Sequence, residues 1–456
     1  MNKLGFILLS ALPPALLEGQ VVPPETTLST SDVARDDFGD AVAISGNTVV
    51  VGAPYANAAY VFVYQNATWT QQAKLTTGTN FSVGFGASVG ISAETIVVGE
   101  KSSGANYNAT VFVRSGSYWT CQATLNIPHS TFIYPQVAIS GDTFVASSYV
   151  ASPAEDSAYV FVRSGNSWTQ QADLVPNIRI GGFFGETVAI DADTAVVGAP
   201  GTNLCYVFVR SGGVWSEQAQ LNNIGGQNDD RFGDAVAISG DTALVGAPFR
   251  DTGAGPEHGA ALAFARNGAN WSLQATLNPD PNNAYNNPRF GYSVAISGNT
   301  ALVGTPYYYA SGGEIGSVWV FGRNGSQWDG QEMAPTHARA SAEHFGAAVA
   351  IDGTLAVVGT PQYYYYDLPG RAYVYDGSGA CSRFARCDPS VIWVDFAYTG
   401  SERGCSDQPY NTLAEGIAAV PAGGSLAVIS GTNSVKPKLS KPMKISACGG
   451  AVTIGR

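Results

Sequence analysis

The sequence has few charged residues, and the acidic ones outnumber the basic ones. Charged residues make up 13% of the 456 positions, and the net charge is −12 at pH 7. Nucleic-acid binding requires a basic face that neutralises phosphates, so this composition argues against a nucleic-acid partner. The few lysines include a late cluster: Lys436, Lys438, Lys441 and Lys444. We interpret this cluster as a solvated edge that discourages strand pairing, with contact to acidic polymers as the alternative.

Long apolar stretches are also missing, with one exception near the N-terminus. Residues 4–17 form an apolar run that follows Lys3, a pattern typical of a secretory signal peptide. The run is too short to span a bilayer comfortably, so we expect no membrane span. We predict a signal peptide at residues 1–19 and a secreted or cell-surface location. The alternative is an apolar leader that packs on the fold.

Cysteine is scarce, and most of it lies late in the chain. The six cysteines are Cys121, Cys205, Cys381, Cys387, Cys405 and Cys448. Two disulfides among the last four would agree with export, and the sequence leaves all three pairings open. A zinc site is disfavoured because the sequence contains no CxxC motif.

The sequence also lacks the motifs of common enzyme classes. The four histidines are scattered, and there is no HExxH motif, P-loop or dinucleotide fingerprint. We therefore expect no enzyme and no cofactor. A glycoside hydrolase that uses two loop carboxylates stays open as an alternative.

What the sequence does have is a repeat. Copies of FGDAVAISGNTVVVGAP begin at Phe38, Phe85, Phe184, Phe232, Phe290 and Phe345, and a degenerate copy begins at Ile133. Seven copies spaced by 47 to 58 residues indicate the blades of a β-propeller. In the first repeat we predict strands at 41–45, 48–52, 60–64 and 69–75, separated by turns rich in Gly, Asn and Asp.

Two further patterns bear on how the blades pack. A WTQQAKL-like segment begins the fourth strand of six repeats, at Trp69, Trp119, Trp168, Trp215, Trp271 and Trp328. We predict that these tryptophans pack between neighbouring blades rather than form a sugar-binding ring. The seventh repeat lacks a good fourth strand, so we expect residues 22–29 to complete it and cover two sheet edges.

The repeated FG…VAI…VVGAP pattern resembles the FG-GAP repeat of integrin α-subunit propellers and of many bacterial surface proteins. The resemblance covers residues 22–380 and implies an all-β, seven-bladed propeller, which we place at residues 20–380. Family members usually bind calcium in a long loop between strands one and two. Here that turn is as short as Ser45-Gly46-Asn47, so we expect the family calcium sites, and any metal, to be absent. The pairs Asp36-Asp37 and Asp229-Asp230 are expected to be solvated loop starts.

Residues 381–456 form a separate small module with a different pattern. Strand-like segments at 392–395, 426–429, 443–447 and 452–455, with a short helix at 409–416, resemble the opening of a pectin-lyase-like parallel β-helix. A lyase needs many stacked coils, so we interpret this segment as an accessory or attachment module.

Candidate ligand-binding residues lie in the long connections of repeats five to seven. They are Arg250, Asp251, His258, Tyr307, Tyr308, Tyr309, Tyr363, Tyr364, Tyr365 and Arg371. Tyrosine and arginine are common anchors at interfaces, and variable loops on a rigid scaffold are where binding usually lies. The alternative is that these tyrosines only pack the loops together. We predict a monomeric binding protein for an extracellular protein or glycan, with adhesion as one fitting role. The alternatives are a lectin-like or hydrolytic carbohydrate-active protein and a structural surface component.

Overall fold

The computed structural model describes most of the repeat region and parts of the C-terminal module. The described residues are 25–30, 36–77, 82–102, 106–128, 135–148, 157–178, 182–252, 256–278, 288–310, 313–314, 316–333, 344–361, 370–376, 391–394, 417–418, 420, 425–433 and 444–454. They fall into two compact units. The larger, Thr26–Phe321 with Ser326–Val374, is an all-β propeller of seven antiparallel blades. The fold class predicted from the repeats is therefore confirmed.

Each of the first four blades is a four-stranded sheet whose strands follow in chain order. Blade one contains β2 (Ala41–Ser45), β3 (Thr48–Ala53), β4 (Ala58–Gln65) and β5 (Thr68–Leu75). Blade two contains β6 (Ser82–Ser92), β7 (Thr95–Ser102), β8 (Asn106–Ser115) and β9 (Tyr118–Ile127). Blade three contains β10 (Val137–Ser140), β11 (Thr143–Ser148), β12 (Ser157–Ser164) and β13 (Ser167–Leu174). Blade four contains β14 (Val188–Asp191), β15 (Thr194–Ala199), β16 (Leu204–Ser211) and β17 (Val214–Asn222).

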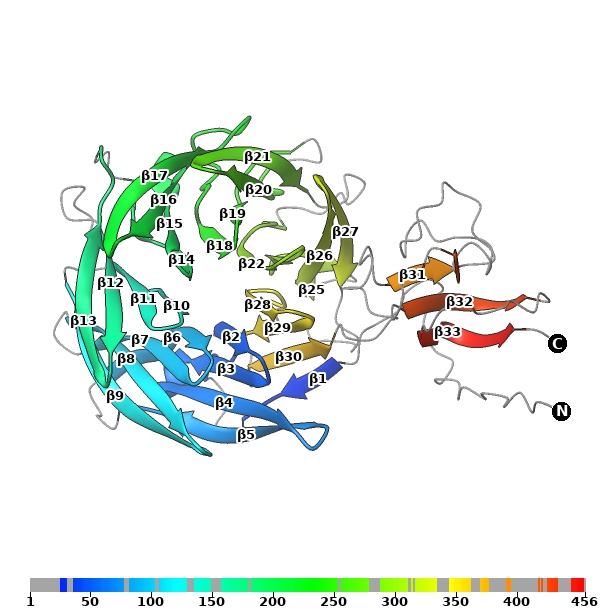
Figure 1. Ribbon diagram of the computed structural model, residues 1–456, viewed down its shortest axis with the longest axis horizontal. Helices are drawn as coiled ribbons and strands as arrows, with labels where there is room; N and C mark the ends of the chain where they lie inside the picture. The colour runs from blue at the N-terminus through cyan, green and yellow to red at the C-terminus, as the bar shows by residue number, and fades with distance from the viewer. Residues whose placement is uncertain are drawn as a thin grey trace. The chain divides into compact units, whose positions relative to one another are not determined.

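The last three blades complete the ring. Blade five contains β18 (Ala235–Ser239), β19 (Thr242–Ala247), β20 (Ala260–Asn267) and β21 (Asn270–Leu277). Blade six contains β22 (Ser293–Ser297), β23 (Thr300–Thr305), β26 (Ser317–Asn324) and β27 (Gln327–Met333), with a small hairpin of β24 (Tyr309–Ala310) and β25 (Gly313–Glu314). Blade seven contains β28 (Ala348–Asp352), β29 (Leu355–Thr360), β30 (Arg371–Asp376) and β1 (Glu25–Leu28). Figure 1 shows the first strand of each blade nearest the centre of the ring.

The N-terminal strand closes the ring, as predicted. In blade seven the strand order is β1-β30-β29-β28, so β1 supplies the outer strand from the opposite end of the repeat region. The hydroxyl of Tyr375 donates a hydrogen bond to Glu25 Oε2 at 3.0 Å. Leu28 is buried and packs in a cluster with Phe38 of blade one and Val357 of blade seven. This strand therefore joins the first and last blades.

The two glycines that mark most of the repeats meet between neighbouring blades. A Cβ on Gly52, in the GAP segment of blade one, would lie 1.9 Å from the carbonyl oxygen of Gly86, in the FG segment of blade two. A Cβ on Gly86, whose φ is +98°, would lie 2.3 Å from the carbonyl oxygen of Ala58. Only glycine fits this backbone approach, which explains why both glycines recur.

The short turns between strands one and two also link the blades. In blade one, Gly46 and Asn47 alone separate the paired residues Ser45 and Thr48. The last residue of each first strand accepts a hydrogen bond from the turn of the next blade, and seven such bonds run round the ring. They are Ala93 N to Ser45 Oγ, Gly141 N to Ser92 Oγ, Ala192 N to Ser140 Oγ, Gly240 N to Asp191 Oδ2, Gly298 N to Ser239 Oγ, Gly353 N to Ser297 Oγ and Gly46 N to Asp352 Oδ2.

The repeated tryptophans lie between blades, which confirms the structural interpretation. Trp119 Nε1 donates to Gln72 Oε1 of the preceding blade at 2.8 Å. Four further bonds follow the same rule: Trp168 to Gln122, Trp215 to Gln171, Trp271 to Gln218 and Trp328 to Gln274. Each acceptor is the glutamine three residues after the tryptophan of its own blade, so one signature supplies both partners.

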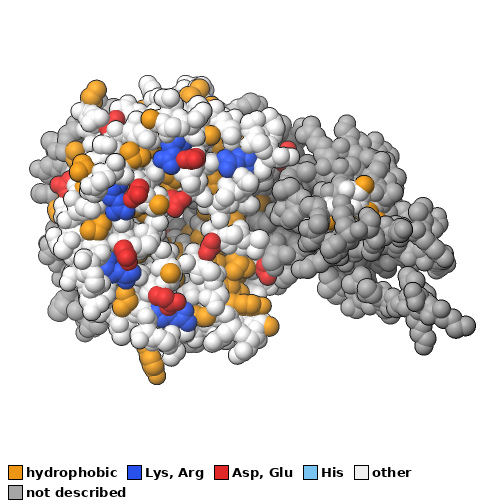
Figure 2. All heavy atoms as spheres, in the orientation of Figure 1, with side chains coloured by type: hydrophobic (Ala, Val, Ile, Leu, Met, Phe, Trp, Pro, Cys, Tyr) orange, Lys and Arg blue, Asp and Glu red, His pale blue; other side chains and the backbone are white. Residues whose placement is uncertain are grey.

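Arginines complete these contacts on the face formed by the turns between strands one and two and between strands three and four, here called the tight-turn face. Arg266 lies over the ring of Trp271, pairs with Asp241 at 2.6 Å and donates to Thr194 of the preceding blade. Arg163 and Arg210 repeat this arrangement. Figure 2 shows basic and acidic side chains paired at intervals around one face of the propeller.

The smaller unit includes the chain from Tyr375 onward. Its described strands, β31 (Val391–Val394), β32 (Ser425–Asn433) and β33 (Lys444–Ile454), form a parallel sheet in that order. The two strands predicted at 443–447 and 452–455 are one continuous strand, β33. The predicted helix at 409–416 lies outside the described residues, and the likeness to a β-helix stays a prediction. No helix in the described part of the chain is long and apolar enough to cross a membrane.

Candidate functional site

The candidate site lies on the face opposite the tight turns. We call it the loop face, because the connections between strands two and three and those between consecutive blades share it. The FG segment of each blade enters its first strand from this side. In blade five the residue before the motif, Arg231, has a left-handed φ of +54°, and the amide of Asp234 donates to its carbonyl oxygen at 3.1 Å. The same turn places Arg289 and Tyr292 in blade six.

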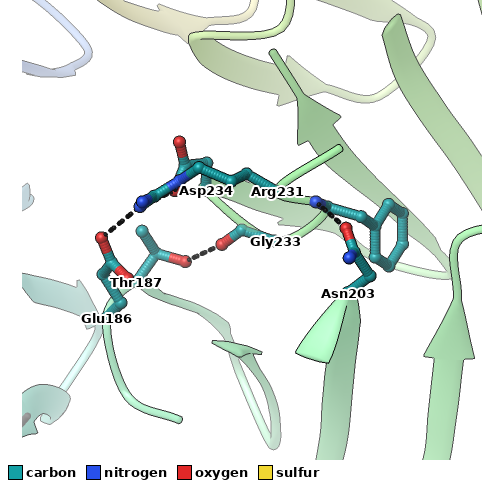
Figure 3. A network of polar contacts seen from close by, with 7 residues as sticks. Glu186, Thr187, Asn203, Arg231, Gly233 and Asp234 are labelled. Carbon is teal, nitrogen blue, oxygen red and sulfur yellow. Dashed lines mark hydrogen bonds and ion pairs between the residues drawn. The ribbon is translucent and has the colours of Figure 1, made fainter. Parts of the chain in front are cut away.

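An ion-paired group joins blades four and five at the inner end of this face. Arg231 Nη2 lies 2.7 Å from Glu186 Oε1 and 2.6 Å from Asp234 Oδ1. Asp234 lies immediately before β18 and Glu186 lies two residues before β14, and Figure 3 shows the guanidinium between their carboxylates. The side chains of Arg231 and Glu186 are 36% and 23% exposed, so the group still reaches solvent.

The surroundings raise the pKa values of both carboxyl groups. Burial raises the pKa of Glu186, and the charge of Asp234 raises it further, against the lowering effect of Arg231. Burial also raises the pKa of Asp234, although Arg231 and then Arg289 oppose the change. Two half-buried carboxyl groups therefore share one guanidinium at the inner end of the loop face.

Local hydrogen bonds hold this group in place. Thr187 Oγ1 donates to the carbonyl oxygen of Gly233 at 2.7 Å, which links blades four and five directly. Asn203 Oδ1 accepts from the backbone N–H of Phe232 at 2.8 Å. Asn203 ends the short 3-10 helix η2 (Pro200–Thr202) in a left-handed conformation, as Asn57 does after η1 (Pro54–Ala56). The turn that carries Arg231 is thereby tied to the preceding blade.

An aromatic group continues the site across blades five and six. The guanidinium of Arg289 lies 4.6 Å from the ring centroids of both Phe249 and Tyr307. Tyr307 also meets Tyr292 edge to face at 5.6 Å and His344 of blade seven at 5.4 Å. Burial raises the pKa of Tyr292, as do Tyr307, Asp40 and Asp234. We call Glu186, Arg231, Asp234, Arg289, Tyr292 and Tyr307 the channel-mouth network.

The structure places the predicted site residues unevenly. Tyr307 belongs to the network, where it is half-buried rather than exposed. Tyr308 is half-buried beside it, and its carbonyl oxygen accepts from Gly316 N. Tyr309 begins the β24–β25 hairpin. Arg371 is exposed at the start of β30. Tyr363, Tyr364 and Tyr365 lie outside the described residues.

The blade-five candidates are bound to neighbouring loop residues. Arg250 donates to Asn223 Oδ1 at 2.9 Å and to the carbonyl oxygen of Ile224 at 3.0 Å. Asp251 is exposed, and its carboxylate accepts from the amide of Glu257. His258 was expected to be available to a ligand, but it is only 4% exposed, and burial lowers its pKa. The histidine is thus part of the loop's interior, and its role in ligand binding stays a prediction.

The acidic pairs also differ from expectation. Asp36, Asp37 and Asp230 are buried, and only Asp229 is exposed as predicted. Asp36 Oδ1 accepts from Phe38 N at 3.1 Å, and Asp230 Oδ2 accepts from Gln227 N at 2.8 Å. These carboxylates satisfy the backbone of the loop that leads into the FG segment, which is why they are not solvated. Among the described residues, no group of three or more His, Cys, Asp or Glu side chains is placed to hold a metal ion.

Most of the channel-mouth network was missed from the sequence. Its members flank the constant Phe-Gly pair: Arg231 and Asp234 in repeat five, Arg289 and Tyr292 in repeat six, and Glu186 in repeat four. The available signal was variation at the positions before and after the Phe-Gly pair, where the side chain differs between several repeats.

Comparison with known proteins agrees with this architecture. The model of the FG-GAP repeat family matches four segments, residues 25–62, 168–212, 215–264 and 271–321. No curated protein matches the chain significantly. A chain in the crystal structure of the mitotic checkpoint complex is 12% identical with a TM-score of 0.50, over 82% of this chain and 98% of that one. A protein from Lactobacillus plantarum is 14% identical with a TM-score of 0.47, over 68% of this chain and 88% of that one.

The seven-bladed ring defines the class of protein, a β-propeller, and four of its segments are similar to the FG-GAP repeat. At 12% identity, the likeness to the checkpoint-complex chain concerns the fold alone.

Proposed function

We propose that this propeller is a secreted or cell-surface recognition protein that binds an extracellular protein or glycan through the channel-mouth network. The observation that carries the proposal is Arg289, which lies between Phe249 and Tyr307 at the point where the loops of blades five and six meet. Half-buried arginine and tyrosine side chains held by a rigid scaffold are typical of interface hot spots. Adhesion is one role that such a surface would serve.

Charge and geometry support recognition of a polar ligand. Within a short span the network presents two guanidinium groups, two carboxylates and two phenol rings, and these groups come from three blades. Tyrosine rings stack on sugars as well as on peptide side chains. The fixed turns before the FG segments hold the groups in place, which limits the ordering cost on binding.

The test is a binding screen of the full chain against a glycan array and a panel of extracellular proteins, with and without calcium. For any ligand found, we expect Arg289→Asn to weaken binding at least about tenfold, or about 1.4 kcal/mol. Asparagine tolerates the left-handed conformation of residue 289. Thermal unfolding of the variant would show that the fold is intact.

The matched control for this screen is Val214→Ser. Val214 is 69% exposed at a hairpin tip on the tight-turn face, so the change should leave binding intact. Equal binding by Arg289→Asn and the unmodified chain would contradict the channel-mouth assignment. No binding in either screen would favour the structural-component alternative.

Hydrolysis of a carbohydrate is the second candidate, and one observation favours it. Glu186 and Asp234 are two neighbouring carboxyl groups with raised pKa values, as in sites that need one acid and one base. Under this alternative, polysaccharide cleavage would be lost in both Glu186→Gln and Asp234→Asn. We place recognition first because Arg231 is ion-paired to both carboxylates.

A further inference from the structure

Five Asn-x-Ser/Thr triplets occur in the sequence, and the fold treats them very differently. They begin at Asn66, Asn80, Asn108, Asn270 and Asn324. This triplet is the acceptor for N-linked glycosylation when the middle residue is not proline. Asn80 lies outside the described residues, so the other four can be compared.

Three of these asparagines lie in or directly beside the turn between the third and fourth strands, in three different blades. Asn66 is in the two-residue turn between the paired residues Gln65 and Thr68 of blade one. Asn270 begins the fourth strand of blade five, directly after its turn. Asn324 ends the third strand of blade six, directly before its turn. Each therefore lies at the tip of an outer hairpin.

These three tips are open to solvent. The asparagines are all exposed, as are the hydroxyl residues two positions later, Thr68, Ser272 and Ser326. Within the described part of the chain, the three asparagine side chains make no hydrogen bond. A sugar attached to any of them would point into solvent and displace no packed group.

The fourth triplet is built into the sheet and provides an internal control. Asn108 Nδ2 donates to Glu100 Oε1, and the hydroxyl of Thr110 bonds to the same carboxylate at 3.2 Å. Thr110 is 1% exposed and Glu100 is 3% exposed. A sugar on Asn108 would break this buried network, so a folded chain should carry none there.

We propose that Asn66, Asn270 and Asn324 are N-glycosylation sites of the secreted protein. In the transfer, the side-chain nitrogen of asparagine bonds to C1 of the first sugar of a lipid-linked oligosaccharide. The bond from C1 to the lipid diphosphate breaks, the diphosphate leaves, and the amide gives up one proton. This inference rests on the proposed secretion, because the donor is met only in the secretory pathway.

The positions of the sites also assign roles to the two faces. The hairpin tips adjoin the turns between strands one and two, since Tyr64 N bonds to Asn47 O at 2.8 Å and Arg266 N to Asp241 O at 2.8 Å. The sugars therefore project from the tight-turn face of blades one, five and six. The loop face with the channel-mouth network stays uncovered, so glycosylation and ligand binding are compatible.

The test is peptide mapping of the full chain secreted from a eukaryotic cell line behind an added secretory leader. Enzymatic deglycosylation in heavy-oxygen water marks each formerly glycosylated asparagine as labelled aspartate. We expect label at Asn66, Asn270 and Asn324 and none at Asn108. Thr68→Val should remove the label at residue 66 alone, because the acceptor triplet is lost while its asparagine stays.

Each outcome decides between defined alternatives. An unlabelled asparagine at any of the three tips overturns the assignment of that site, and label at Asn108 in folded protein overturns the argument from burial. The same protein expressed without the added leader tests secretion separately. If this protein stays in the cell while the protein with the added leader is glycosylated, the proposed secretion fails and the acceptor positions stand.

Discussion

Asp37 shows how strongly its surroundings change a single carboxyl group. Burial raises its pKa, the charges of Asp40 and Asp36 raise it further, and the result is about 7. An ordinary aspartate in the unfolded chain titrates near 3.8. Asp37 therefore favours folding while it is protonated, and it loses this advantage as the pH rises from about 4 to about 7.

We expect Asp37→Asn to remove this dependence on pH. The unmodified chain should lose up to about 1.4 kcal/mol of unfolding free energy per pH unit within that window, and the variant should lose less. Asparagine also suits the left-handed φ of +50° at this position. Urea unfolding between pH 4 and pH 8 measures the difference, with the exposed Asp229→Asn as the control for charge. Parallel curves for Asp37→Asn and the unmodified chain would contradict the raised pKa.

The glycines of the repeat give a second prediction for single residues. Gly291 has a φ of +91°, and a Cβ there would lie 2.3 Å from the carbonyl oxygen of Ala260. We expect Gly291→Ala to lower the unfolding free energy by about 3 kcal/mol or more, from backbone strain and the clash together. Gly298→Ala is the matched control, because its φ is also positive and nothing lies within 4 Å of the added Cβ. Its cost should stay near 1 kcal/mol, and equal losses would contradict the packing explanation.

The residue patterns predicted where strands and blade contacts lie better than they predicted which loop side chains are buried. The motifs Phe-Gly and Trp-x-x-Gln recur because neighbouring blades pack against each other at these residues. They therefore indicated the packing between blades correctly. The burial of Asp36 and His258 depends on how a loop folds over its own backbone, which no periodicity records. The network around Arg231 depends on which blades are adjacent, and this follows only from the order of the repeats in the ring.

At the level of elements, the short strand β1 has an importance beyond its four residues. It pairs with β30 and buries Leu28 against blades one and seven. The sequence predicted this closure because the last repeat lacked a good fourth strand. In contrast, the ligand-binding role of the three candidate tyrosines after Pro361 stays a prediction, because they lie outside the described residues.

We expect Leu28→Ala to lower the unfolding free energy by about 2–5 kcal/mol, because it removes a buried side chain from the closing strand. Thr27→Ala is the control, since Thr27 is exposed on the same strand and should change stability by less than about 0.5 kcal/mol. Denaturant unfolding of both variants measures the difference. A loss for Thr27→Ala as large as that for Leu28→Ala would contradict the explanation from burial of Leu28.

At the level of the whole molecule, the contacts between blades form a circle. Seven hydrogen bonds join successive turns, and the bond from Gly46 N to Asp352 Oδ2 joins the first blade to the last. In an open repeat array the end units can unfold alone, because each lacks one neighbour. A closed ring has no end unit, so each blade keeps two neighbours until the circle opens.

We therefore expect the propeller to unfold in one cooperative transition, and its own tryptophans can report it. Indole groups bond across five blade interfaces, so their fluorescence follows the separation of the blades. Far-UV circular dichroism follows the strands. In the unmodified chain the two transitions should coincide in denaturant. Fluorescence that changes at lower denaturant would mean that blades separate before they unfold.

The Leu28→Ala variant weakens the closure of the circle and should move both transitions to lower denaturant. In this variant the fluorescence change should come before the change in circular dichroism.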